Sequence, residues 1–190
     1  MTVLLVVGVG LWIGAHMFKR LAPAARAAMT ARMGEGSKGI FALLLVLSIV
    51  LMVIGYRGAD YVPLYFPPLW TGHLNNLLMV LAFYVFGIGM AKGALSQRFR
   101  HPMLTGTLLW ALSHLLVRGD LASVILFGGL AAWAVVAMVL INAAEPRWNP
   151  PPRKRGPRDL VAIPIVLVTY AVVGLIHRWL GVNPFGNLGS

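Results

Sequence analysis

The side chains best suited to chemistry in this chain are its histidines. Five of them are spread along 190 residues that contain only five acidic side chains and no cysteine: His16, His73, His101, His114 and His177. The lack of cysteine excludes disulfides, thiolate metal sites, cysteine nucleophiles and covalent c-type haem. A metal or a haem would therefore be held by side chains such as histidine.

Two of these histidines share a local pattern. Trp12 stands four residues before His16, Trp110 stands four residues before His114, and each tryptophan follows a leucine. On a helix, this spacing places an indole one turn away from the imidazole. An indole in that position can form the wall of a site for a flat apolar ligand, and haem b is such a ligand.

The stretch with the most specific pattern is RHPMLTGTLLWALSHLLVRGD, residues 100–120. Pro102 fits the first turn of a helix, so Arg100 and His101 lie at the start of that helix. Thr107, Trp110 and His114 follow spacings of three and four and share one face. An ionisable ring on a segment of leucine and alanine is by default a functional hypothesis.

Composition places these helices in a membrane. Hydrophobic residues make up 59% of the chain and charged residues 11%, whereas soluble domains carry about a quarter charged residues. The net charge of +11 would suggest nucleic acid as a partner of a soluble protein. Here the cations gather between apolar segments, as the positive-inside rule produces, so we expect a lipid bilayer and no nucleic acid.

The sequence predicts an all-α fold, an integral membrane six-helix bundle formed as one transmembrane domain over residues 1–190. The apolar segments predict helices at about 2–18, 39–56, 69–91, 102–117, 121–142 and 160–180. We expect a loop between the first two helices. Only a short turn separates 102–117 from 121–142, so these two helices should form an antiparallel hairpin.

The loops also predict an orientation. Sixteen Lys and Arg side chains are present, and all except Arg57, Arg118 and Arg178 fall in the loops after the first, third and fifth predicted helices. These loops should therefore be cytoplasmic, which puts both termini in the periplasm.

The motifs resemble those of the NnrU family of bacterial membrane proteins. The resemblance is carried by RHPMLTG, WALSHLL, GD and SVILFGGLAAW, by His16, and by the stretch from His177 to Pro184. It implies a multi-pass protein of the bacterial inner membrane that is associated with denitrification. The implied partners are components of nitrite or nitric oxide reductase. The family usually has Asn where this chain has Arg118.

A plant relative of that family, 15-cis-zeta-carotene isomerase, holds haem b with two histidines. By this resemblance, the iron ligands here fall on His16 and His114, with Trp12 and Trp110 beside them. His101 and His114 cannot pair on one straight helix, because thirteen residues separate them by ~20 Å along the axis. His16 and His114 differ in expected depth by on the order of 10 Å. His73 or His177 matches His114 better in depth, so these alternatives stay open.

Two other functions remain possible from the sequence. The motif of Arg100, His101, Pro102 and Gly106 also resembles the start of isoprenylcysteine-type membrane methyltransferases, which use S-adenosylmethionine. Their second acidic and aromatic signature has only Glu145 as a counterpart here. The other possibility is a non-catalytic accessory subunit of a membrane reductase or of its assembly. We expect a haem b protein that serves nitrogen-oxide respiration or a related redox or isomerase task.

The predicted orientation can be tested with reporter fusions along the chain. Reporters in residues 21–37, 92–100 and 143–159 should have cytoplasmic activity, because these segments carry the excess of cations. A periplasmic signal from the Pro-rich segment 143–159 would contradict both the orientation and the number of helices.

Overall fold

The computed structural model describes residues 1–184, and this part of the chain is all-α, as predicted. The helices are α1 (Thr2–Leu21), α2 (Pro23–Met33), α3 (Gly36–Arg57), α4 (Thr71–Ala91), the 3-10 turn η1 (Leu95–Gln97), α5 (Pro102–Leu115) and α8 (Arg158–Trp179). Between α5 and α8, the segments α6 (Leu121–Ser123), η2 (Val124–Gly128, a π-helical turn) and α7 (Gly129–Ala144) follow one another without a break.

Five helices in the described part are long and apolar enough to cross a membrane: α1, α3, α4, the continuous helix Leu121–Ala144, and α8, with 20–24 residues each. The predicted count of six is not confirmed. The helix predicted at 102–117 forms, but it ends at Leu115 and has 14 residues. At 1.5 Å per residue it spans ~21 Å, which is less than the ~30 Å of a hydrocarbon core.

The segment between the first two long helices is helical, which corrects our expectation of a loop. α2 is rich in alanine, begins with Pro23 at its first turn, and ends at Gly34, whose φ is 55°. Alanine has the highest helix propensity, and Pro is tolerated at a first turn, so local preference outweighs the charge of this segment. The next helix, α3, begins at Gly36, directly after this turn.

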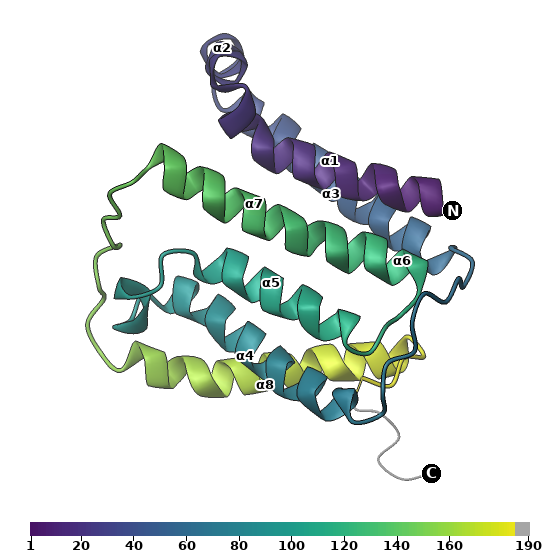
Figure 1. Ribbon diagram of the computed structural model, residues 1–190. Helices are drawn as coiled ribbons and strands as arrows, with labels where there is room; N and C mark the ends of the chain where they lie inside the picture. Colours follow the sequence, from purple (N-terminus) through teal and green to yellow (C-terminus); the bar gives the residue numbers. More distant parts are fainter. Residues whose placement is uncertain (185–190) are drawn as a thin grey trace. The chain divides into compact units, whose positions relative to one another are not determined.

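The chain divides into two compact units, which we describe separately. The first unit comprises Met1–Tyr65 and Gly119–Trp133. In it α1 lies along α3 (Figure 1). Glycines permit this close packing: a Cβ at Gly55 would lie 2.4 Å from the Leu5 nitrogen, and one at Gly8 would lie 2.8 Å from the Met52 nitrogen. Leu5 is fully buried in this contact.

The second unit comprises Phe66–Arg118 and the chain from Ala134 onward. Here α4 packs against both α5 and α8 (Figure 1). Small residues again allow the approach, because a Cβ at Gly89 would lie 3.0 Å from Pro102 and one at Gly87 would lie 3.3 Å from Val166. Gly106 likewise has no room for a Cβ beside Phe86.

Contacts along α5 confirm the antiparallel arrangement of α5 and the helix that follows it. Arg100 donates to the Glu145 carbonyl, His101 bonds to Asn142, and Thr105 bonds to Met138. In these three contacts, the residue number rises from Arg100 to Thr105 while that of the partner falls from Glu145 to Met138. The start of α5 therefore lies beside the end of α7.

The Gly-Asp turn after α5 belongs to the first unit and is held by a polar network. The Gly119 carbonyl accepts from the Leu64 and Tyr65 nitrogens at 2.7 and 3.1 Å. Asp120, only 7% exposed, accepts from the Ser123 nitrogen at 2.9 Å and from the Ser123 hydroxyl at 2.7 Å. Burial raises the pKa of the Tyr65 hydroxyl, and the nearby Asp120 carboxylate raises it further. Because its carboxylate accepts from the Ser123 nitrogen, Asp120 caps the helix that begins at Leu121.

Replacing Asp120 by Ala should destabilise the protein by about 1–2 kcal/mol, because the helix loses its N-cap and the Ser123 hydroxyl loses an acceptor. In mild detergent, the midpoint of thermal unfolding should fall by roughly 2–8 °C. Asp60→Ala is the control, since Asp60 is an exposed carboxylate in the connection after α3. Equal effects of the two substitutions would contradict the capping role.

Candidate functional site

His114 lies near the end of α5, and its own helix fixes its ring. Nδ1 is 2.8 Å from the carbonyl oxygen of Trp110. A carbonyl oxygen can only accept, so Nδ1 carries the proton and the lone pair is on Nε2. Metal-binding histidines commonly have this arrangement, in which the outer nitrogen donates to a backbone carbonyl and the other nitrogen can bind a metal. The ring also packs on Trp110, with 5.1 Å between centroids, as the spacing predicts.

His16, on α1 in the first unit, has the same arrangement. Its Nδ1 is 2.9 Å from the Trp12 carbonyl oxygen, which again puts the lone pair on Nε2. The Trp12 indole lies 4.3 Å from the imidazole between ring centroids. The sequence pattern therefore predicts the contact of each histidine with the tryptophan four residues before it.

A second indole lies beside His16, and the sequence pattern does not predict it. Trp133 of α7 lies 4.7 Å from His16 and 5.7 Å from Trp12 between ring centroids. It ends the SVILFGGLAAW run that contributed to the family resemblance, but its position in that run does not predict a contact with α1. His16, Trp12 and Trp133 form a cluster of three rings within one unit.

Both indoles of this cluster carry a buried N–H that has no partner within the described chain. Trp133 is only 8% exposed. A buried donor without an acceptor costs roughly 1–3 kcal/mol, so such groups are normally paired with protein, water or a ligand. A bound group that offers acceptor oxygens would satisfy them.

A third histidine follows the same rule. His177 of α8 has its Nδ1 2.8 Å from the Val173 carbonyl oxygen. It lies in the second unit, close enough to His114 for an electrostatic interaction. No tryptophan stands four residues before it, which is why the sequence pattern did not group it with the other two. His73, the other alternative, has an exposed side chain.

The residues of the Arg-His-Pro motif have structural roles in the second unit. Pro102 is in the first turn of α5, and His101 precedes it as the N-cap residue. His101 Nε2 is 2.8 Å from Asn142 Oδ1, and Arg100 donates to the Glu145 carbonyl. Gly106 gives Phe86 room to approach. The motif ties the start of α5 to the end of α7.

Residues 1–184 contain no group of three or more His, Asp or Glu side chains that could hold a bare metal ion. A haem needs fewer protein ligands, because one or two histidines suffice for its iron. His16, His114 and His177 each have the required tautomer, and the rings beside His16 and His114 suit a flat apolar group. The donor set in the described chain therefore fits haem b.

A match to one known protein family covers almost the whole chain. A protein-family model described as NnrU protein matches residues 4–184. The chain belongs to the NnrU family. No curated protein and no solved structure matched it. The NnrU match includes all five histidines, both tryptophans of the His16 cluster, and the Arg-His-Pro motif.

The structural role of His101 can be tested with a double-mutant cycle of His101→Ala and Asn142→Ala. The two substitutions should couple by about 0.5–1.5 kcal/mol in unfolding free energy, because they share one hydrogen bond.

Calorimetry should detect no saturable binding of S-adenosylmethionine to the wild type. Binding that His101→Ala weakens would support the methyltransferase alternative instead.

Proposed function

We propose that this NnrU-family protein is a membrane haem b protein in which the His114 imidazole would bind the iron. The observation that supports this proposal most directly is the Nδ1 bond of His114 to the Trp110 carbonyl. This bond holds the ring in the tautomer that presents Nε2 to a metal before any ligand arrives. A ligand that is already oriented costs less entropy when it binds.

The second ligand is proposed to be His16 or His177. His16 is favoured by the family resemblance. Like His114, it also has a tryptophan four residues before it. A specific observation favours His177: it lies in the same unit as His114. Both have the Nδ1 bond to a carbonyl oxygen four residues earlier, so substitution must decide between them.

The protein would orient the haem and set its properties. The two histidine bonds and the apolar surroundings would tune the potential of the iron, and the neighbouring indoles would keep water from the ring. Bound haem b would supply an iron that changes oxidation state and that would take a small ligand in place of one histidine. Nitrogen oxides are such ligands, which agrees with a role in denitrification and with reductase components as partners. A related isomerase task would use the same iron on an apolar substrate.

We propose that the protein lies in the bacterial inner membrane with both termini in the periplasm. This orientation needs an even number of crossings, so it counts the short α5 as a sixth crossing beside the five long helices. Support comes from the second unit, where the basic segments 92–100 and 145–158 bond to each other and so lie at one end. A cluster of cations at one end of apolar helices favours the cytoplasmic side.

The proposal predicts that His114 is the histidine the protein can least spare. Protein purified in mild detergent after expression with haem precursor should show a Soret band. His114→Gly should lose the haem or become five-coordinate, and added imidazole should restore the wild-type spectrum because it replaces the missing ligand. His101→Ala and His73→Ala are matched controls that should leave the spectrum intact.

The partner follows from the remaining two substitutions. Whichever of His16→Gly and His177→Gly reproduces the loss, with rescue by imidazole, identifies the second ligand. A wild type that takes up no haem, or a His114→Gly variant with an unaltered Soret band, would overturn the proposal in favour of an accessory subunit.

A further inference from the structure

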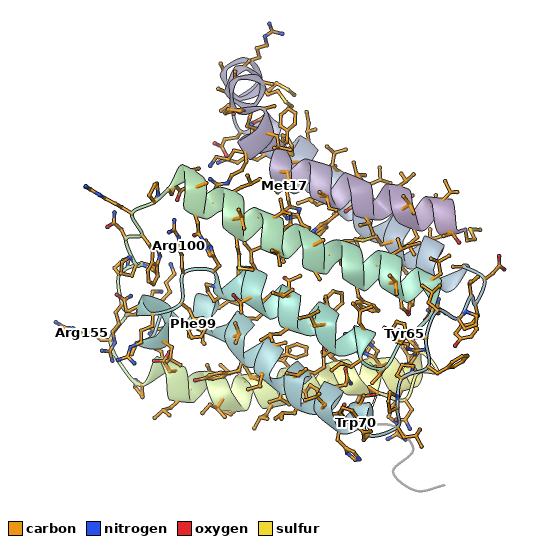
Figure 2. All side chains as sticks on the ribbon, in the orientation of Figure 1. Met17, Tyr65, Trp70, Phe99, Arg100 and Arg155 are labelled. Atoms are coloured by element: carbon orange, nitrogen blue, oxygen red, sulfur yellow. The ribbon has the colours of Figure 1, made fainter. Side chains whose placement is uncertain are left out.

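Two basic loops of the second unit are joined into one surface. We call residues 92–100 and 145–158 the basic surface. The backbone nitrogen of Lys154 donates to the Lys92 carbonyl at 3.0 Å. The Gln97 side chain donates to the Pro151 carbonyl, and the Arg100 side chain donates to the Glu145 carbonyl. Figure 2 shows Arg100 and Arg155 at this end of the unit. Its cations are Lys92, Arg98, Arg100, Arg147, Arg153, Lys154, Arg155 and Arg158.

Asp159, the first residue beyond this surface, joins the loops through its carboxylate. Oδ2 accepts from the Ala94 nitrogen at 2.6 Å and from the Leu95 nitrogen at 3.4 Å. A Cβ at position 93 would lie 2.1 Å from Asp159 Oδ1, so a larger residue there would displace the Asp159 carboxylate. The Asp159 carboxylate is thus bonded to backbone amides, and these bonds hold the two loops together.

Three successive cations of this surface line a hollow. Arg153, Lys154, Arg155 and Gly156 line a depression of about 260 Å³ that is open to the surface. The backbone there is fixed by the Lys154 bond to Lys92, by Arg158 Nε donating to the Arg155 carbonyl at 3.3 Å, and by Gly156, whose φ of 98° favours glycine. Neighbouring like charges repel, so the arrangement favours an anion in the hollow.

The position of the hollow in the chain points to the source of that anion. Three membrane-crossing candidates meet the basic surface: α4 ends at Ala91, the continuous helix from Leu121 ends at Ala144, and α8 begins at Arg158. The ends of such helices lie at the level of lipid headgroups. Lys and Arg at this level attract anionic lipids, and a guanidinium binds phosphate with paired hydrogen bonds.

We propose that the Arg153–Gly156 hollow is a binding site for the phosphate of an anionic phospholipid headgroup. The positive-inside rule alone predicts cations on this side of the membrane, but it predicts neither loops that are bonded together nor three cations around one hollow. The inference goes beyond the haem proposal and does not depend on it. It predicts affinity for one headgroup at one place.

Native mass spectrometry of the full-length protein in mild detergent tests this site. Titrated phosphatidylglycerol should give a saturable adduct of one lipid per chain, whereas phosphatidylcholine should not. Replacing Arg153, Lys154 and Arg155 by Ala should weaken phosphatidylglycerol binding by roughly a hundredfold, since each cation near the surface contributes about fivefold. Lys19, Arg32 and Lys38 are exposed cations outside the basic surface. Replacing these three by Ala removes the same charge and should change binding less than twofold.

Two further variants keep the test decisive. Gly93→Ala keeps every charge but collides with Asp159, so it should weaken binding about tenfold by loosening the loops. Arg155→Gln keeps the length of the loop and most of its charge, and it should weaken binding about fivefold even if the triple variant fails to insert. Equal losses in the two triple variants, equal binding of phosphatidylcholine, or full competition by soluble glycerol phosphate would each overturn the proposal.

Discussion

A polar side chain on a membrane helix must find a hydrogen-bond partner within the protein, because the hydrocarbon core supplies none. This constraint governs the polar groups of the long helices here. Ser48 donates to the Leu45 carbonyl and Thr169 to the Ile165 carbonyl, so each helix satisfies its own hydroxyls. Three histidines follow the same rule through Nδ1. For an imidazole the consequence is larger than for a hydroxyl, since satisfying one nitrogen determines the chemistry of the other.

The exceptions to this rule are informative. Within the described chain, four side-chain atoms are buried without a partner: the indole nitrogens of Trp12 and Trp133, Asn75 Oδ1 and Asp159 Oδ1. Groups of this kind in a folded protein need an explanation such as an ordered water or a ligand. Two of the four belong to the ring cluster around His16. Unsatisfied donors beside a histidine with a fixed tautomer are what a ligand site in an apolar protein would present.

Local patterns predicted local structure well. The Trp-His spacing anticipated both ring pairs, and Pro102 correctly marked the start of α5. The patterns could not give the length of α5, because hydropathy continues past Leu115 into the turn that leads to Gly119. They also missed Trp133 beside His16 and Asp159 beside Gly93, since both contacts join residues far apart in the sequence. The helix α2 was not predicted because its arginines suggested a loop, although its alanines favour a helix.

The claim on which this account rests is that the backbone sets the tautomer of His114 before any cofactor binds. Solid-state NMR of ligand-free protein in lipid, labelled with ¹⁵N-histidine, measures this directly, and a His114→Gln sample assigns the resonance. The account predicts a protonated Nδ1 at His114, and the opposite tautomer at His101, whose Nε2 bonds to Asn142 Oδ1. A protonated Nε2 with a bare Nδ1 at His114 would contradict it.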